Sequence, residues 1–297
     1  MTHVVGFSPH KDDHGAIALA CRLARSDADD VHAVTVVPQG WPTAVAGDTD
    51  REFEAWAAEQ GAEASREASA LLAEHPDVAG VATWVAGRSV PQALLDRAEV
   101  LAADLVVVGS GDAGAPGRVS LTSKVDRLLH SSPLPVAIAP RDYAAAPEDR
   151  VTRVTVAFRG DDETWALLDR VAEIVRRVDA AIRLVTFAVR APSTVPPRVS
   201  RAEDQVYRQW RRQSEEGLAE AAGHLGSLGF RPDQVEAEVV VGTSWTRAVD
   251  AVSWRDGDVL VVGSSATHRL AQVFLGSSAT RIVRHSPVPV IVVPASR

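Results

Sequence analysis

The chain has 297 residues, of which 46% are hydrophobic and 24% charged, and its formal net charge is -8 at pH 7. This length has room for two ordinary domains with cores of their own, and the composition is that of a soluble globular protein. The negative charge gives no general attraction to nucleic acid or to anionic membranes, and no apolar run is long enough to cross a bilayer. Neither nucleic acid nor a membrane is therefore expected as a partner.

The N-terminal segment and the single cysteine indicate the compartment. Residues 1–7, MTHVVGF, have no basic start and no long apolar segment, so they predict a first strand and not a signal peptide. Cys21 lies in an Ala/Leu-rich helical pattern and cannot form an internal disulfide. We expect a cytoplasmic protein with a buried structural thiol.

Strands and helices alternate along the whole chain. Short, continuously apolar runs predict buried strands, and longer runs with helical spacing predict helices. In the first half the order is strand 4–7, helix 12–25, strand 31–37, helix 50–74, strand 81–86, helix 90–102, strand 105–108, a loop, a helix ending at 130 and strand 136–139. In the second half it is strand 154–158, helix 163–178, strand 182–187, helix 202–225, strand 235–241, helix 244–252, strand 259–262, a loop, a helix from 276 and strand 290–293. This alternation predicts parallel sheets covered by helices on both faces.

The two halves are copies of one domain. Residues 121–136 align without a gap on residues 275–290, and both segments contain Ser-Pro-x-Pro-Val. The same offset places 104–109 on 258–263. Internal repeats of this kind decide the domain organisation, so we predict a first domain at 1–141, a linker at 142–150 and a second domain at 151–297.

A phosphate-type loop is predicted near the C-terminus. The segment from Asp258 to Thr267 reads as a strand, a glycine exit at Gly263 and a loop of small residues, and a helix start follows at Gly276-Ser277-Ser278, whose hydroxyls can cap free backbone N–H groups. Small residues let backbone donors approach a ligand, and the helix start adds a partial positive charge. The combination predicts an anion site, with phosphate as the favoured anion.

Two other patterns favour weaker alternatives. Residues 109–114, GSGDAG, match the dinucleotide-binding pattern G-x-G-x-x-G, but Pro116 and Gly117 prolong the loop where that fold needs a helix to begin. His10 and His14 have i,i+4 spacing on a helix start but supply only two metal ligands. No metal site and no catalytic group are therefore expected.

The loop pattern Gly-x2-Gly-x9-Gly-(Ser/Thr), followed by Pro-x-Pro-Val, resembles that of the universal stress protein family. The second copy reads GSSA at 263–266, nine residues, then Gly276-Ser277. The first copy reads GSGD at 109–112, nine residues, then Thr122-Ser123, so it has lost two of the three glycines. The resemblance covers the chain as a tandem pair, with the better site in the second domain.

The resemblance implies an α/β fold of two tandem domains, each a five-stranded parallel sheet with helices on both faces, of the Rossmann-like, adenine nucleotide alpha hydrolase-like type. It implies a stress-response protein with a regulatory role, which binds ATP or AMP, with or without Mg²⁺, and hydrolyses ATP at most slowly and incidentally. It also implies an internal pseudo-dimer in which the last strands of the two domains pair, and a homodimer is a further possibility. Carried over by position, the cofactor-binding residues are Val262, Gly263, Ser264, Ala266, Gly276, Ser277, Ser278, Arg159 and Phe187.

Departures from the family pattern leave alternatives open. The family's Asp at the end of the first strand falls on Ser8 and Arg159. Asp12 or Asp13, and Asp161 or Asp162, are substitutes or simple helix caps, and Arg159 is a phosphate ligand or a solvated loop arginine. Asp112 and Thr122 predict that the first site does not accept a triphosphate. The rival function is an interaction or scaffold protein of the same fold without bound nucleotide; a hydrolase would need a catalytic group that the sequence does not display.

Overall fold

The computed structural model describes residues 2–9, 14–41, 47–111, 114–190, 197–264 and 275–295, with the backbone alone for 197–201. The chain divides between Arg150 and Val151 into two compact units, and each is described by itself below. The predicted pairing of the two last strands and the predicted homodimer stay predictions.

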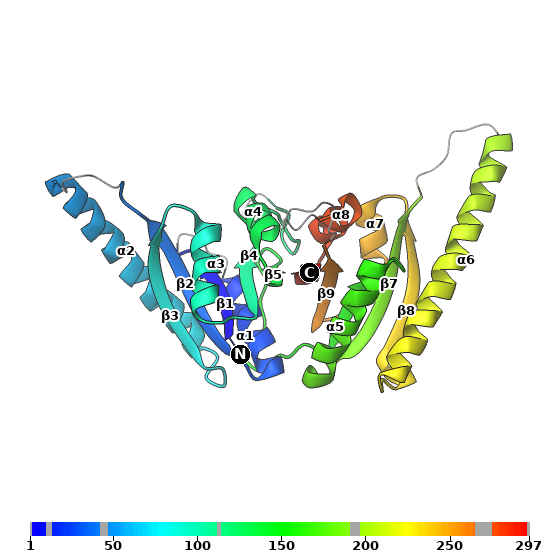
Figure 1. The fold of residues 1–297 in the computed structure, drawn as a ribbon, viewed down its shortest axis with the longest axis horizontal. Helices are drawn as coiled ribbons and strands as arrows, with labels where there is room; N and C mark the ends of the chain where they lie inside the picture. Colours follow the sequence, from blue (N-terminus) through cyan, green and yellow to red (C-terminus); the bar gives the residue numbers. More distant parts are fainter. Residues whose placement is uncertain are drawn as a thin grey trace. The chain divides into compact units, whose positions relative to one another are not determined.

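The first unit is a five-stranded parallel sheet in the order β3-β2-β1-β4-β5 (Figure 1). Helices α1 and α2 pack on one face of this sheet, and α3 and α4 pack on the other. Residues Leu105 to Val108 of the central strand β4 are all buried because both faces are covered, which explains their unbroken apolar sequence. The elements of this unit are β1 (Thr2–Phe7), α1 (Gly15–Asp27), β2 (Asp30–Pro38), α2 (Asp48–Ala73), β3 (Gly80–Gly87), α3 (Val90–Val100), β4 (Leu105–Gly109), α4 (Ser123–Ser131) and β5 (Val136–Ala139).

The second unit repeats this arrangement with parallel strands in the order β8-β7-β6-β9-β10. Helices α5 and α6 contact one face, and α7 and α8 contact the other. The predicted α/β class, with two tandem domains and helices on both sheet faces, is therefore confirmed. The elements are β6 (Arg153–Ala157), α5 (Asp162–Val178), β7 (Ala181–Val189), α6 (Pro197–Ser227), the short 3₁₀ turn η1 (Pro232–Gln234), β8 (Val235–Gly242), α7 (Trp245–Asp250), β9 (Asp258–Gly263), α8 (Ser277–His285) and β10 (Val290–Val293).

Several helices differ in their bounds from the sequence prediction; α3, for example, ends at Val100, two residues before its predicted end. Helix α6 begins at Pro197, five residues earlier than expected, which places proline at a helix start, where its missing N–H costs no hydrogen bond. Helix α7 ends at Asp250, two residues early. The reason is local: the indole Nε1 of Trp254 donates to the Val249 carbonyl at 2.8 Å, so the chain turns back on the helix end instead of continuing it.

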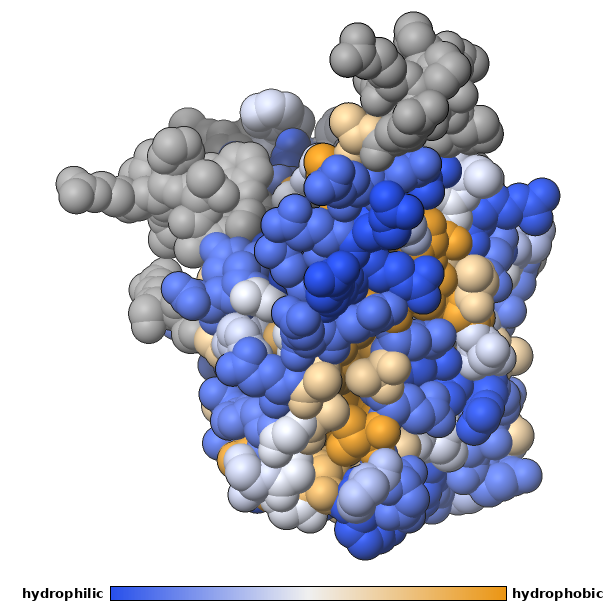
Figure 2. All heavy atoms as spheres, turned by 90° about the vertical axis from the view of Figure 1, so that its right-hand side faces the viewer, coloured by the Kyte–Doolittle hydropathy of each residue, from blue (hydrophilic) through white to orange (hydrophobic). Residues whose placement is uncertain are grey.

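The surface on the α6 side is mainly hydrophilic, with small apolar areas between the polar side chains (Figure 2). Exposed charged pairs such as Arg211 with Glu215, at 2.8 Å, belong to this helix. In the part of the chain that the structure describes, no helix combines the length and the apolar character needed to cross a bilayer.

Two buried arginines of α1 hold the segment that leads out of the first unit. Arg22 Nε donates to the Arg150 carbonyl at 3.1 Å and its Nη1 to the Tyr143 hydroxyl at 2.8 Å. Arg25 Nη1 donates to the Asp149 carbonyl at 3.0 Å, while its Nη2 donates to Asp77 at 2.9 Å. This hydrogen bonding lowers the pKa of Asp77 to about 2. The predicted linker is therefore bound to the first unit by charged hydrogen bonds.

Replacing Arg25 by alanine is expected to open this segment to proteases. Hydrogen bonds to charged groups contribute about 1.5–3 kcal/mol each, and about 1.4 kcal/mol changes an equilibrium constant tenfold. The open form of the segment should therefore become at least about tenfold more populated, and trypsin cleavage after Arg141 or Arg150 should accelerate by the same factor. Mass spectrometry of a cleavage time course measures this. Arg51→Ala is the matched control, because Arg51 is an exposed arginine bonded to Asp48 on α2. Equal cleavage rates of both variants would contradict the conclusion that Arg25 holds this segment on the first unit.

Candidate nucleotide site

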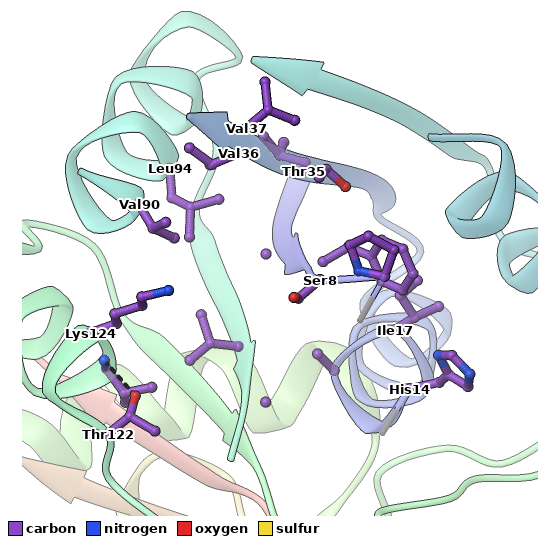
Figure 3. Close-up of a pocket in the computed structure, with 18 of the residues that line it drawn as sticks. Ser8, His14, Ile17, Thr35, Val36, Val37, Val90, Leu94, Thr122 and Lys124 are labelled. Atoms are coloured by element: carbon purple, nitrogen blue, oxygen red, sulfur yellow. Dashed lines mark hydrogen bonds between the residues drawn. The ribbon is translucent and has the colours of Figure 1, made fainter. Parts of the chain in front are cut away.

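A cavity of about 350 Å³ lies in the first unit, at the carboxyl ends of β1, β2 and β4 (Figure 3). Strand order reverses between β1 and β4, because β1 pairs with β2 on one side and with β4 on the other. Ligands of open parallel sheets bind at such switch points, where the loops above neighbouring strands separate. The cavity therefore occupies the position at which this fold class binds small molecules.

The body of this first-domain cavity is apolar. Val36 and Val37 of β2, Val90 and Leu94 of α3, and Ile17 of α1 point into or border it. Gly6 makes room for one wall, since a β-carbon there would lie 2.9 Å from Cδ1 of Leu94. An apolar chamber of this kind suits a planar ring or another weakly polar group.

Polar groups also line the first-domain cavity. Lys124, in the first turn of α4, directs its amine toward the cavity, and the hydroxyl of Ser8 at the end of β1 faces the same space (Figure 3). Thr122 caps α4, because its Oγ1 accepts a hydrogen bond from the Val125 amide at 3.2 Å. Lys124 was not among the residues predicted from the sequence; its place in the first turn of the helix after the loop is the signal that could have identified it.

The loop between β4 and α4 uses its own backbone donors. The Gly111 amide donates to the Ser120 carbonyl at 3.4 Å, and the Gly114 amide donates to the Gly111 carbonyl at 3.3 Å. Ser110 Oγ accepts from the Ser120 amide at 3.0 Å and donates to the Ala139 carbonyl at 2.6 Å. These amides are thus hydrogen-bonded within the loop, and the expectation that this copy does not accept a triphosphate stays a prediction. Asp112 lies outside the described residues.

In the second unit, three predicted residues lie at the carboxyl end of β9. Val262 is buried and Gly263 pairs with Val293 of β10. Ser264 is buried, and its Oγ accepts a hydrogen bond from the Ala295 amide at 3.0 Å. The hydroxyl therefore joins the exits of β9 and β10, and the same is true of Ser110 in the first copy. Ala266 lies outside the described residues.

Gly276, Ser277 and Ser278 form the start of α8. Gly276 is the cap residue and offers no side-chain oxygen, so the hydroxyl cap expected from the sequence is not made at this position. The Gly276 carbonyl accepts from the Thr280 amide at 2.9 Å. The first turn of α8 therefore begins with a bare glycine backbone, whereas Thr122 caps the matching helix of the first copy.

Arg159 lies beside this helix start. A β-carbon placed on Gly276 would be 3.9 Å from Nη1 of Arg159. The guanidinium is half-exposed and pairs through Nη2 with Asp161 at 2.7 Å and with Glu163 at 3.5 Å. Asp161 also caps α5, accepting from the Thr164 amide at 2.9 Å. The cap interpretation therefore holds for Asp161, and Arg159 is a paired cation close to Gly276.

Phe187 is on β7, at the position that Val36 has on β2. It is half-buried and packs against the buried cluster of Val185, Val240 and Val252, which Trp254 also contacts. The larger ring fills space at a position where the first copy has the small valine that lines its cavity. The space beside this position of the second strand is therefore smaller in the second domain than in the first.

Cys21 has the structural role expected of it. It is completely buried, and burial raises the pKa of its thiol to about 12. A thiol with this pKa is protonated at neutral pH and is a poor nucleophile.

Comparisons with known proteins agree with this architecture. A universal stress protein from Mycobacterium tuberculosis is 38% identical over 296 residues, which cover 99% of this chain and 100% of that protein. Another, from Mycolicibacterium smegmatis, is 25% identical over 295 residues, which cover 98% and 96% of the two chains. The solved structure of a universal stress protein from Archaeoglobus fulgidus matches with a TM-score of 0.62 at 16% identity, covering 99% of this chain and 98% of that one.

The sequence model of the universal stress protein family matches this chain twice, at residues 1–140 and 150–294. Both matches coincide with complete five-stranded units, and the Mycobacterium tuberculosis relative matches this chain over its whole length. The chain belongs to the universal stress protein family.

Proposed function

We propose that this protein binds an adenine nucleotide, ATP or AMP, in the second domain and acts in a stress response as a regulator and not as a catalyst. One observation carries the proposal: the uncapped glycine start of α8 lies next to the guanidinium of Arg159. The first amides of a helix and its dipole favour an anion, and a guanidinium adds a charge-assisted donor. The predicted phosphate ligands are the backbone of Gly276 and the backbone and hydroxyls of Ser277 and Ser278.

The acidic neighbours of Arg159 bear on the form of the nucleotide. Asp161 and Glu163 both lie within 3.5 Å of its guanidinium, so part of its charge is already balanced. Carboxylate and phosphate oxygens together are the ligands that Mg²⁺ prefers. The proposal therefore includes Mg²⁺ with ATP, since the ion reduces repulsion between the nucleotide and the two carboxylates.

The first-domain cavity is a second candidate location for the nucleotide. Its apolar chamber and the Lys124 amine favour it, while the loop amides committed to internal hydrogen bonds favour a short anionic group over a triphosphate there. The two locations are separable by substitution, because Gly276 and Leu94 belong to different units.

Gly276→Asp is expected to weaken nucleotide binding about 100-fold in calorimetric titrations with ATP and Mg²⁺, because like charges placed together cost several kcal/mol. Gly223→Asp is the matched control: it adds the same charge to α6, where a β-carbon meets nothing within 4 Å. Leu94→Trp fills the first-domain cavity and should leave ATP affinity unchanged.

Each other outcome has a definite meaning. Loss of binding in Leu94→Trp with normal binding in Gly276→Asp would move the nucleotide to the first domain. Absence of heat with both ATP and AMP at millimolar concentration would refute nucleotide binding and favour the interaction or scaffold function. Turnover of ATP well above background would refute the regulatory, non-catalytic role.

A further inference from the structure

A cluster of one histidine and two aspartates lies in the first unit, at the amino ends of the strands. His3 comes from β1, Asp27 ends α1, and Asp29 precedes β2. One ligand atom of each side chain lies within 4.8 Å of the other two, and His3 Nε2 is 3.3 Å from Asp29 Oδ2. Because the nucleotide loops are at the carboxyl ends of the strands, this cluster is a separate place in the fold.

The turn after α1 places the two carboxylates on the same side as the histidine. Ala28 between them has φ 58°, in the left-handed region. Both the Ala28 amide and the Asp29 amide donate to the Ala24 carbonyl, the latter at 3.0 Å. The backbone of the turn is thus held by its own hydrogen bonds, and the carboxylates are presented by a rigid segment.

The His3 ring carries an unusual feature. The residue is 2% exposed, and its Nδ1 is buried without a hydrogen-bond partner among the described residues. The other ring nitrogen, Nε2, is the one that faces the carboxylate of Asp29, at 3.3 Å from its Oδ2.

The second domain shows that the fold itself does not need these polar residues. In the strand register of the second unit, the position of His3 is taken by Val154, which pairs with Val259 as His3 pairs with Leu105. Helix α5 also ends in a left-handed residue, Asp179, which corresponds to Ala28, and it is flanked by Val178 and Ala180. In the second domain, the positions of His3, Asp27 and Asp29 are therefore occupied by the apolar residues Val154, Val178 and Ala180.

We propose that His3, Asp27 and Asp29 bind a divalent transition-metal ion, with Zn²⁺ as the best-fitting species. Two ligands at about 2.0–2.1 Å from one tetrahedral ion are separated by about 3.3 Å, which is the separation between His3 Nε2 and Asp29 Oδ2. One imidazole and two carboxylates form a mixed nitrogen and oxygen set that suits Zn²⁺ or Mn²⁺ better than Mg²⁺. The bound ion would tie the end of α1 to β1, and water would complete its coordination.

Calorimetric titration of the chelator-treated full chain with Zn²⁺ tests the site. One equivalent is expected to bind, and the melting temperature should rise with it. His3→Val and Asp29→Ala install the residues of the copy and should weaken this binding at least about 100-fold, while circular dichroism shows an unchanged fold without metal. Asp30→Ala is the matched control, because Asp30 is the adjacent exposed acid, and its substitution should alter the affinity less than twofold.

Several results would overturn the site. If the full chain binds no Zn²⁺, or if His3→Val and Asp29→Ala both bind with unchanged affinity, the ion is held elsewhere or not at all. An equal response to Mg²⁺ would indicate a general electrostatic effect. Nucleotide titrations of the same variants should be normal, so failure of this site and failure of the proposed nucleotide site are distinguishable.

Discussion

Replacing Asp258 by asparagine is expected to lower the free energy of unfolding of the second domain by about 3–5 kcal/mol, because it leaves two buried guanidinium groups without their shared counter-charge. Arg153, Arg183 and Asp258 are all less than 5% exposed. Asp258 accepts from Arg153 Nε at 2.9 Å and Nη2 at 2.7 Å, and from Arg183 Nη2 at 3.3 Å.

The two arginines respond differently to the same carboxylate. Its hydrogen bonds raise the pKa of Arg153, whereas burial lowers the pKa of Arg183. Arg183 also lies 4.9 Å from the centre of the Trp254 ring and donates to the Ser253 carbonyl at 3.0 Å. Removal of the Asp258 charge thus affects the segment that follows α7 as well as strands β6 and β7.

Hydrogen exchange measured by mass spectrometry is the suitable test, because a two-domain chain need not unfold in one step. Amides of β6 and β9 should exchange faster in Asp258→Asn, while those of the first unit should keep their protection. Glu236→Gln is the matched control: its carboxylate also pairs with Arg153, at 3.0 Å, but is about half-exposed, so its loss should cost no more than about 1 kcal/mol. Equal effects of the two variants would show that burial does not determine how much each carboxylate stabilises the second domain.

Gly242→Ala is expected to destabilise the second domain by about 1–3 kcal/mol, with the upper end favoured because the obstacle is backbone. A β-carbon on Gly242 would lie 2.2 Å from the Ala248 nitrogen and 2.7 Å from both the Ala248 α-carbon and the Arg247 carbonyl carbon. Helix α7 would have to move away from the end of β8 to admit the methyl group.

Gly223→Ala supplies the opposite expectation for the same chemical change. Gly223 is within α6, where an added β-carbon meets nothing within 4 Å. Alanine there should stabilise the helix by about 0.5–1 kcal/mol, since glycine loses more backbone freedom on folding. Thermal unfolding followed by circular dichroism compares the two variants. Destabilisation of similar size in both would mean that close packing at Gly242 is not the cause.

Much of the fold was predictable because its signals are local. Central strands such as β4 and β9 have apolar runs of the right length, and the strand at Val136–Ala139 was predicted with the observed bounds. Helix ends were less accurate: α7 stops at Asp250 because Trp254, four residues beyond, turns back to bond the Val249 carbonyl. Contacts made by the chain after a helix are not visible in the periodicity of the helix itself.

The candidate sites were predictable only in part. The sequence pattern identified Gly276 and Arg159 separately, but their proximity depends on how the end of β6 faces the start of α8. The cavity of the first domain was missed because its walls come from strands, helices and loops that are far apart in the chain. The cluster of His3, Asp27 and Asp29 was missed for the same reason.

The sequence by itself determined the duplication, the α/β class and the family of this protein, since these follow from repeated segments and from the spacing of apolar residues along the chain. Only the tertiary structure decided what equivalent positions of the two copies do. Asp104 and Asp258 align in sequence, yet one oxygen of Asp104 is buried without a partner among the described residues, while Asp258 joins two arginines. The physical reason is that the environment of a side chain is set by neighbouring strands and helices, which the two copies furnish with different residues.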